Sequence, residues 1–207
     1  MPTEVLSYYL KNKDRKVRLG FQVILQCAPF LKGLKVSGLI SMENESYSEL
    51  EEMLNDKEYS LNVFGIERGN TKPRKDIAKW SDVKESIIYM YNNKFADTNV
   101  EYQFGKIDNK EEINKILISY IEKHFSISDD KQTWFDKMKD LAEEYGYARE
   151  VKEYKQNPEN YKGHVGDIST VIRVALTGRQ NTPDLYEIMQ VLGENSIRER
   201  IEKVIGK

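Results

Sequence analysis

Hydrophobic residues near the C-terminus recur at the spacing of amphipathic helices. Within residues 166–179 the apolar positions are Ile168, Val171, Ile172 and Ala175. Positions three and four apart share one face of a helix, so this pattern predicts a helix with one buried side. Asp167 is placed to cap its N-terminus and Gly178 to end it, whereas Arg173 falls outside the apolar stripe.

Two further helices are predicted after this one. Thr182 is a candidate N-cap, with Pro183 at the first helical position, where its missing N–H costs nothing. Gly193 should end this helix, and Ser196 with Glu199 has the spacing of a capping box for the last one. The apolar stripes of the two helices are Leu185, Ile188, Met189 and Leu192, then Ile197, Ile201, Val204 and Ile205.

The same periodicity extends upstream. One helix is predicted to start at Asp108 and Glu111, and another at Asp129 or Asp130. Their apolar positions are Ile113, Ile116, Leu117, Tyr120 and Ile121, then Trp134, Met138, Leu141 and Tyr145. Residues 108–205 should therefore be almost wholly helical, without a sheet.

The N-terminal third has a different pattern. Residues 36–42 and 59–66 are short apolar or alternating runs, which predict two strands. Between them Ser46 and Glu49 form a capping box for a helix. This part of the chain therefore favours a small α+β element.

A basic segment follows at residues 68–79. Gly69 and Pro73 break it, and Ser81 is placed to cap a helix behind it. That helix would carry Val83, Ile87, Tyr91 and Phe95, before a connection at residues 96–107. The basic and aromatic side chains of the segment are Arg68, Lys72, Arg74, Lys75, Lys79 and Trp80.

These elements predict a mainly α protein. The expected domains are residues 1–70, a small α+β region, and residues 71–207, a helical bundle or cage. The helical domain would divide into sub-bundles at about 71–125 and 126–207.

Composition and charge narrow the functional classes. The chain has 207 residues, of which 32% are charged and 39% hydrophobic, as in helical proteins with a sizeable core. No apolar run is long enough to span a bilayer, and the single cysteine, Cys27, fits the reducing cytoplasm. The net charge of −2 produces no overall field that attracts nucleic acid, so an RNA site would have to be a local basic patch.

The sequence contains no recognisable catalytic motif. Its two histidines, His124 and His164, lack the cysteine or carboxylate spacing of a zinc site, and His124 follows a lysine at a predicted helix end. No glycine-rich phosphate loop or nucleophile motif is present. We therefore expect no catalytic residue, no metal, no cofactor and no enzymatic activity of the chain by itself.

Several stretches resemble one family. RVALTGR at residues 173–179, TPDLYEIMQVLG at 182–193 and RERIEKVI at 198–205 look like the C-terminal end of bacterial glutamyl-tRNA synthetases. KPRKDIAKWSDV at 72–83 resembles the first helical segment of their anticodon-binding region. The resemblance covers residues 45–207 and implies a helical cage that holds a tRNA anticodon. The ATP-binding motifs of the family's catalytic half are not in this chain.

The resemblance assigns roles to residues of the cage. Arg173 is expected to bind a base edge or a phosphate, although a buried ion pair is the alternative. Thr182 and Leu185 match positions that line the base pocket, but an N-cap and a core residue explain them equally well. Arg179 extends the same basic surface.

The upstream segment would supply further contacts. Arg74, or failing it Lys75, matches the basic position that reads the last anticodon base. Arginine suits this role because its planar group binds a base edge through two hydrogen bonds. The remaining candidates for phosphate or base contact are Lys72, Lys79, Trp80 and, in a glycine-flanked loop, His164.

The function that these observations favour is binding of a tRNA anticodon stem-loop in the cytoplasm, without a membrane or DNA as partner. The initiating methionine and the unmatched N-terminal third favour a free-standing relative of the synthetases over a fragment. One alternative is a paralogue that lost RNA binding and serves as a protein-interaction or regulatory module, which the net negative charge favours. The other is an accessory subunit that pairs in trans with a separate catalytic half. The oligomeric state is not indicated.

Overall fold

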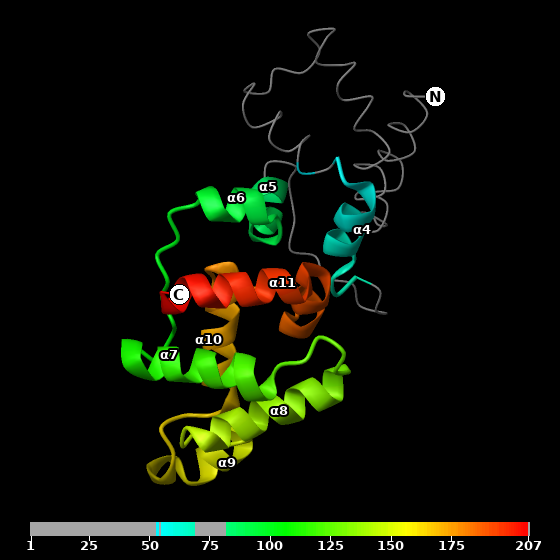
Figure 1. Cartoon of the computed structure of the whole chain (residues 1–207). Helices are drawn as coiled ribbons and strands as arrows, with labels where there is room; N and C mark the ends of the chain where they lie inside the picture. The colour runs from blue at the N-terminus through cyan, green and yellow to red at the C-terminus, as the bar shows by residue number, and fades with distance from the viewer. Residues whose placement is uncertain (1–52, 54, 69–81, 207) are drawn as a thin grey trace, which may run out of the picture. The chain divides into compact units, whose positions relative to one another are not determined.

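The computed structural model describes residues 53, 55–68 and 82–206, and its contacts divide the chain into two units at Tyr91 and Asn92. The first unit contains α4 (Lys57–Gly65), α5 (Asp82–Ile87) and the 3-10 turn η2 (Ile88–Met90). The second contains α6 (Asn92–Asp97), α7 (Lys110–Ser119), the π-helical turn η3 (Tyr120–His124), α8 (Lys131–Glu144), α9 (Val151–Gln156), the 3-10 turn η4 (Pro158–Asn160), α10 (Val165–Thr177) and α11 (Leu185–Ile205) (Figure 1).

The prediction of a mainly α protein is confirmed. Within the described residues no strand forms, and the sole β feature is a parallel bridge between Ala148 and His164. The expectation that residues 108–205 contain no sheet is therefore also confirmed. Most of the expected α+β element, like Cys27, lies outside the described residues.

Helix α10 is the centre of the second unit, where it packs against α7, α8 and α11 (Figure 1). Its predicted apolar positions are all fully buried: Ile168, Val171, Ile172 and Ala175. Burying one aliphatic side chain of this size contributes about 1.5–3 kcal/mol, so this stripe is a main source of the unit's stability. Gly178 ends the helix in the left-handed conformation, as the sequence predicted.

Helix α11 runs across α10 in two straight parts. Gly193 adopts φ 76° and ψ 161°, a conformation that only glycine takes readily, so the predicted break is confirmed as a kink. Ser196 does not cap a new helix, because it lies inside α11 and its hydroxyl accepts a hydrogen bond from Asn92 Nδ2 at 2.7 Å. The predicted stripe is buried at Leu185, Ile188, Met189, Leu192, Ile197 and Ile201, and half-buried at Val204 and Ile205.

A chain of polar contacts crosses the core between η3, α8 and α11. Trp134 Nε1 donates to Tyr120 Oη at 3.2 Å, and Tyr120 Oη in turn donates to Met189 Sδ at 3.1 Å. Buried polar groups cost free energy unless they are paired, so these contacts let two polar aromatic residues occupy the core. Burial raises the pKa of Tyr120, and its phenol therefore remains protonated.

The strand predicted at residues 59–66 is wrong, because this segment forms α4. Asp56 caps the helix by accepting a hydrogen bond from the Tyr59 backbone N–H at 2.9 Å. Val63 and Phe64 are buried whereas Leu61 is 49% exposed, so the apparent alternation of Leu61 and Val63 does not reflect a two-sided strand. Short apolar runs do not distinguish a strand from a helix, and the aspartate cap decides in favour of the helix.

The single helix predicted after Ser81 is also interrupted. Tyr91 adopts an extended conformation, φ −105° and ψ 109°, between η2 and α6. The apolar positions are nevertheless buried as predicted, at Val83, Ile87, Tyr91 and Phe95. Periodicity thus indicated the buried positions without showing the break.

Several helix caps differ from the predicted residues. α7 is capped by Asn109, not Asp108, because Asn109 Oδ1 accepts from two backbone N–H groups of the first turn. α8 starts after Asp130, one of the two predicted residues. α11 starts after Asp184, whose Oδ1 accepts from the Glu187 N–H at 3.0 Å, so Thr182 is not its cap.

Candidate nucleic-acid interface

The turn between α10 and α11, residues 178–184, brings together four of the residues expected to read an anticodon. Arg173 lies in the preceding helix, Arg179 and Thr182 lie in the turn, and Leu185 follows it. We call this segment the basic turn. Gly178 is required at its start, because a Cβ there would lie 2.6 Å from Val100 Cγ1 and the backbone has φ +69°.

Arg173 forms hydrogen bonds with the C-terminal part of the basic turn. Its Nη1 donates to Thr182 Oγ1 at 2.5 Å and to the Pro183 carbonyl oxygen at 2.8 Å. The Thr182 hydroxyl in turn donates to the Pro183 carbonyl oxygen at 3.0 Å. These contacts close the turn across nine to ten residues of sequence, so the half-buried guanidinium fixes the shape that a ligand would meet.

Thr182 and Leu185 are the two residues for which the sequence left a structural and a functional role open. The Thr182 side chain is half-buried and engaged by Arg173, so it is neither an N-cap nor a core residue. Leu185 is only 3% exposed, and it belongs to the core that joins α11 to the rest of the unit. In this conformation the Thr182 side chain is partly exposed on the turn, while Leu185 packs in the core next to the turn.

Arg179 lies at the exposed edge of the basic turn. The Thr177 hydroxyl accepts a hydrogen bond from the Arg179 backbone N–H at 3.2 Å, which holds this part of the chain. Gln180 and Asn181 beside it are also exposed. The turn thus presents one cationic side chain and two amides, groups that can bind phosphate or base edges.

His164 lies at the opposite end of α10, about 20 Å away for a helix of 13 residues. Its Nδ1 accepts from the Gly166 backbone N–H at 3.0 Å, while Asp167 Oδ2 accepts from the His164 N–H at 2.9 Å. His164 is therefore the N-cap, and Asp167 is the third helical residue of a capping box rather than the cap predicted. The capping contact accounts for the position of the imidazole beside α10.

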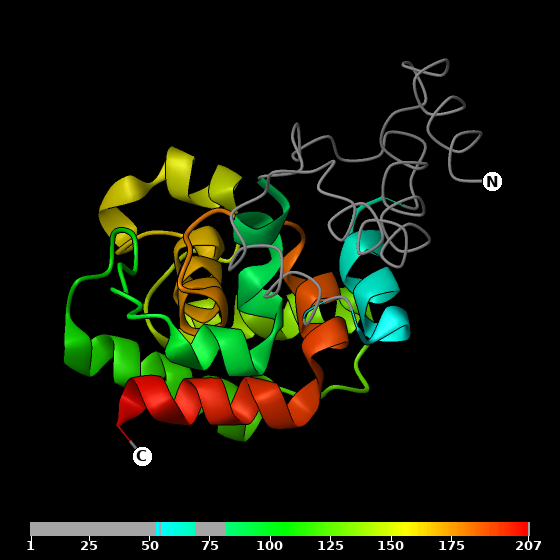
Figure 2. The same ribbon diagram turned by 90° about the horizontal axis from the view of Figure 1, so that it is seen from above.

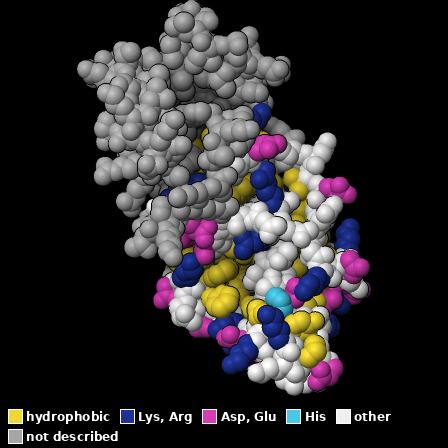
Figure 3. Space-filling view, turned by 180° about the vertical axis from the view of Figure 1, so that it is seen from behind, with side chains coloured by type: hydrophobic (Ala, Val, Ile, Leu, Met, Phe, Trp, Pro, Cys, Tyr) yellow, Lys and Arg dark blue, Asp and Glu magenta, His cyan; other side chains and the backbone are white. Residues whose placement is uncertain are grey.

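The upstream candidates, four basic residues and one tryptophan, lie outside the described residues. They are Lys72, Arg74, Lys75, Lys79 and Trp80. The face of the molecule shown in Figure 3 carries lysine and arginine side chains interspersed with aspartate and glutamate. On that face, charge is mixed rather than segregated by sign.

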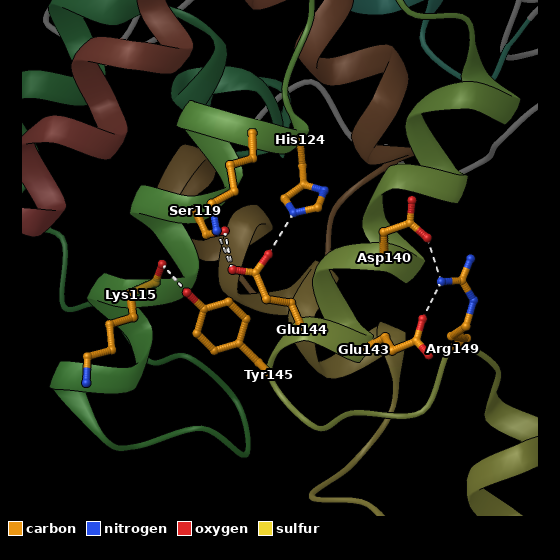
Figure 4. A network of polar contacts seen from close by, with 9 residues as sticks. Lys115, Ser119, His124, Asp140, Glu143, Glu144, Tyr145 and Arg149 are labelled. Atoms are coloured by element: carbon orange, nitrogen blue, oxygen red, sulfur yellow. Dashed lines mark hydrogen bonds and ion pairs between the residues drawn. The ribbon is translucent and has the colours of Figure 1, made fainter.

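A second polar cluster lies between α7, η3 and α8 (Figure 4). Glu144 accepts from the Ser119 hydroxyl at 3.0 Å and from Lys123 Nζ at 2.7 Å, and its Oε2 lies 3.0 Å from His124 Nε2. A serine, a histidine and a carboxylate therefore meet, but both Ser119 and His124 bind the glutamate and not each other. A nucleophilic serine needs the histidine as its base, so this cluster is a structural ion pair and not a catalytic triad.

The Glu144 cluster makes stability depend on pH. Hydrogen bonds from Lys123 and His124 lower the pKa of Glu144 from 4.5 to about 2, so its contribution is complete above about pH 4.5 and lost toward pH 2. The carboxylate is one-third exposed, so we expect Glu144→Gln to lower the free energy of unfolding near pH 7 by only about 1 kcal/mol. Urea denaturation of both proteins should show this difference shrinking below about pH 4.5, and a difference that grew on acidification would contradict it.

Sequence reasoning missed Arg200, which is 5% exposed. Its Nη1 donates to the Leu176 carbonyl oxygen at 2.5 Å, Nη2 donates to Asn92 Oδ1 at 2.6 Å, and the guanidinium lies 4.4 Å from the centre of the Phe95 ring. A signal existed, because residue 200 falls on the same helical face as Ile197 and Ile201. An arginine on an apolar stripe indicates a buried guanidinium that joins several elements.

The described residues contain neither a metal-binding cluster nor a membrane-spanning helix. No cluster of three or more histidine, cysteine, aspartate or glutamate side chains could hold a metal ion there. In the same part of the chain, no helix has both the length and the hydropathy of a membrane span.

Comparison with known proteins addresses the family directly. A family model described as an anticodon binding domain matches residues 49–205. The glutamate–tRNA ligase of Clostridium perfringens strain SM101 is 43% identical over 160 residues, which are 76% of this chain and 29% of the ligase. The ligase of Acetivibrio thermocellus is 40% identical over 168 residues, 81% of this chain and 30% of the ligase. No solved structure matches the chain.

The chain spans less than a third of the length of these curated relatives. The matched region includes every described helix, the basic turn and the upstream basic segment. Because the family model covers most of the chain and the identity extends over the same region, the chain belongs to the family of the anticodon binding domain of glutamate–tRNA ligases.

Proposed function

We propose that the chain binds the anticodon stem-loop of a tRNA through the basic turn and the upstream segment at residues 72–80, as a module without the catalytic half. The observation that carries the proposal is the family match over residues 49–205. The geometry supports it, since Arg173 shapes a turn whose exposed edge carries Arg179 and two amides. We retain the division predicted from the sequence and assign the RNA contacts to residues 71–207, in a protein that acts in the cytoplasm.

The salt dependence of tRNA binding tests this proposal. Phosphate contacts release counterions, so the logarithm of affinity should fall with the logarithm of salt concentration in proportion to the number of contacts. Lys72→Ala and Lys79→Ala should weaken the binding of every tRNA about equally. Each should also reduce the slope of log affinity against log salt concentration by about 0.7–1. Filter binding with purified tRNA at several salt concentrations measures both quantities.

The control for these variants is Lys115→Ala, an exposed lysine of α7 that pairs with Glu111 at 2.7 Å. It should leave affinity and slope unchanged. If the unaltered protein binds tRNA no better than an unrelated acidic protein at low salt, the proposal is wrong.

We further propose that the chain alone does not activate glutamate. The ATP-binding motifs of the synthetase catalytic half are missing from the 207 residues, and the one serine–histidine–carboxylate cluster described is a structural ion pair. Glutamate-dependent pyrophosphate exchange by the purified chain should stay at background. Exchange above background that survives further purification would contradict this expectation.

A protein-interaction module is the second candidate. Two observations favour it: the net charge of −2, and the use of the Arg173 guanidinium within the turn. An accessory subunit acting in trans is a third form, in which a separate catalytic half supplies the chemistry. Isolation of the chain from its native cells separates the three: tRNA alone supports the RNA-binding module, a synthetase catalytic half supports the accessory subunit, and any other protein supports the interaction module.

A further inference from the structure

The connection between α6 and α7 carries two aromatic rings that stack on each other. The centres of the Tyr102 and Phe104 rings are 6.0 Å apart, and their planes differ by 13°. Both side chains are half-buried, whereas Glu101 and Gln103 are exposed. The contact between the two rings places both side chains on the same side of the connection, where each remains partly exposed.

The connection runs past α10 (Figure 2), and on the two sides of this pair it comes close to the start of the basic turn and to α10. Val100 contacts Gly178, where a Cβ would lie only 2.6 Å from Val100 Cγ1. A Cβ at Gly105 would lie 3.1 Å from Thr170 Cγ2 and 3.8 Å from Gln180 Oε1. Tyr102 is two residues after Val100, and Phe104 is one residue before Gly105. Because successive Cα atoms are about 3.8 Å apart, both rings lie close to these two points of approach.

The Tyr102 phenol is partly buried near the charge of Arg200. Burial raises the pKa of Tyr102, and the positive charge of Arg200 opposes this rise. The phenol is therefore protonated at neutral pH and can donate. Within the described part of the chain, its oxygen takes no hydrogen bond.

We propose that Tyr102 and Phe104 form a stacking platform for one unstacked anticodon base, beside the basic turn. Single-stranded RNA is bound by proteins that combine a basic surface with aromatic rings on which bases stack, and the connection and the turn supply these two components side by side. Stacking tolerates any base, so the platform adds affinity, while the side chains of the turn supply sequence preference. This inference rests on the proposed function, because it assigns a base-binding position to the same site.

The competing explanation is that the two rings only cover the interior near Arg200. Leucine would cover an apolar interior almost as well as an aromatic residue, but it cannot stack with a base. Tyr102→Leu and Phe104→Leu therefore separate the two explanations, and Tyr102→Phe and Phe104→Tyr keep the rings. Thermal denaturation shows which variants remain folded.

The test uses a synthetic anticodon stem-loop with 2-aminopurine in one anticodon position, whose fluorescence is quenched by stacking. With the unaltered chain, binding should quench the probe in at least one of the three positions. Each leucine variant should remove that quenching and weaken binding about 5- to 100-fold, with the salt dependence unchanged. The aromatic variants should retain both quenching and affinity.

Tyr145→Leu is the matched control, since Tyr145 lies at the C-terminal end of α8 and its hydroxyl donates to the Lys115 carbonyl oxygen. The start of α8 contacts the basic turn through Lys131 and Asp184, so Tyr145 is about 20 Å from it. If the chain does not bind the stem-loop, the proposed function fails. The platform is also overturned if the chain binds the stem-loop without quenching 2-aminopurine in any anticodon position, or if the leucine variants quench it as strongly as the unaltered chain. In either case the proposed function remains. If one leucine variant unfolds, the other leucine variant decides the matter.

Discussion

Arg200→Ala is expected to lower the free energy of unfolding by about 3 kcal/mol. The substitution removes hydrogen bonds to the Leu176 carbonyl oxygen and to Asn92 Oδ1, and it leaves a cavity against Phe95. A buried carbonyl left without a donor costs about 1–3 kcal/mol, and the lost packing adds to that. The carbonyl belongs to the last turn of α10, where a cation also offsets the negative end of the helix dipole.

Arg198→Ala is the matched control, because it removes the same side chain two residues away. Arg198 is 39% exposed, pairs with Glu194 at 2.8 Å and lies over the Phe125 ring. An exposed pair of this kind contributes about 0–1 kcal/mol. Urea denaturation of both variants should separate them clearly, and equal losses would mean that the buried contacts of Arg200 are not the cause.

Arg173→Ala is expected to weaken binding of the cognate anticodon stem-loop by about 1–3 kcal/mol and to relax the preference for its anticodon. If Arg173 binds a base edge directly, the loss follows from the missing hydrogen bonds. The structure supplies a second route, since the guanidinium shapes the turn through Thr182 and Pro183. Either route acts on base contacts, so the salt dependence should change little, unlike that of Lys72→Ala.

Arg149→Ala controls for the loss of one arginine, because Arg149 pairs with Asp140 and Glu143 at the far end of α8 (Figure 4). It should leave both affinity and preference intact. Arg173→Ala must itself be shown to be folded by thermal denaturation. If it is folded and neither affinity nor anticodon preference changes, the basic turn does not read RNA, and the protein-interaction module becomes the better proposal.

Local signals in the sequence were sufficient for most helices. The stripes of α7, α8, α10 and α11 are buried where helical spacing placed them, except that Ile121, Tyr145, Val204 and Ile205 are half-buried. Gly178 ends α10 and Gly193 kinks α11 at the predicted positions. Such signals depend on residues within one or two turns of each other, which is why they can be recognised without the fold.

The errors share a physical cause. Thr182 has the composition of an N-cap, but Arg173 binds its hydroxyl and the helix starts after Asp184 instead. The alternating run at residues 59–66 fits a strand, but Asp56 caps a helix there. In both places the sequence offered two local solutions of similar quality. At residues 59–66 the local cap at Asp56 favours the helix, whereas at Thr182 the contact with Arg173, nine residues away, excludes the cap.

The sequence by itself therefore determined the mainly α character, the buried faces and the residues that carry the resemblance to the synthetase family. The tertiary structure alone decided which residues share a site. Arg200 binds groups of α6 and α10 that are 108 and 24 residues away. Tyr102 and Phe104 lie near the start of the basic turn because Val100 lies against Gly178 and Gly105 lies close to Thr170 of α10. Contacts over such separations depend on how whole helices pack, and no pattern confined to a few turns of one helix contains that information.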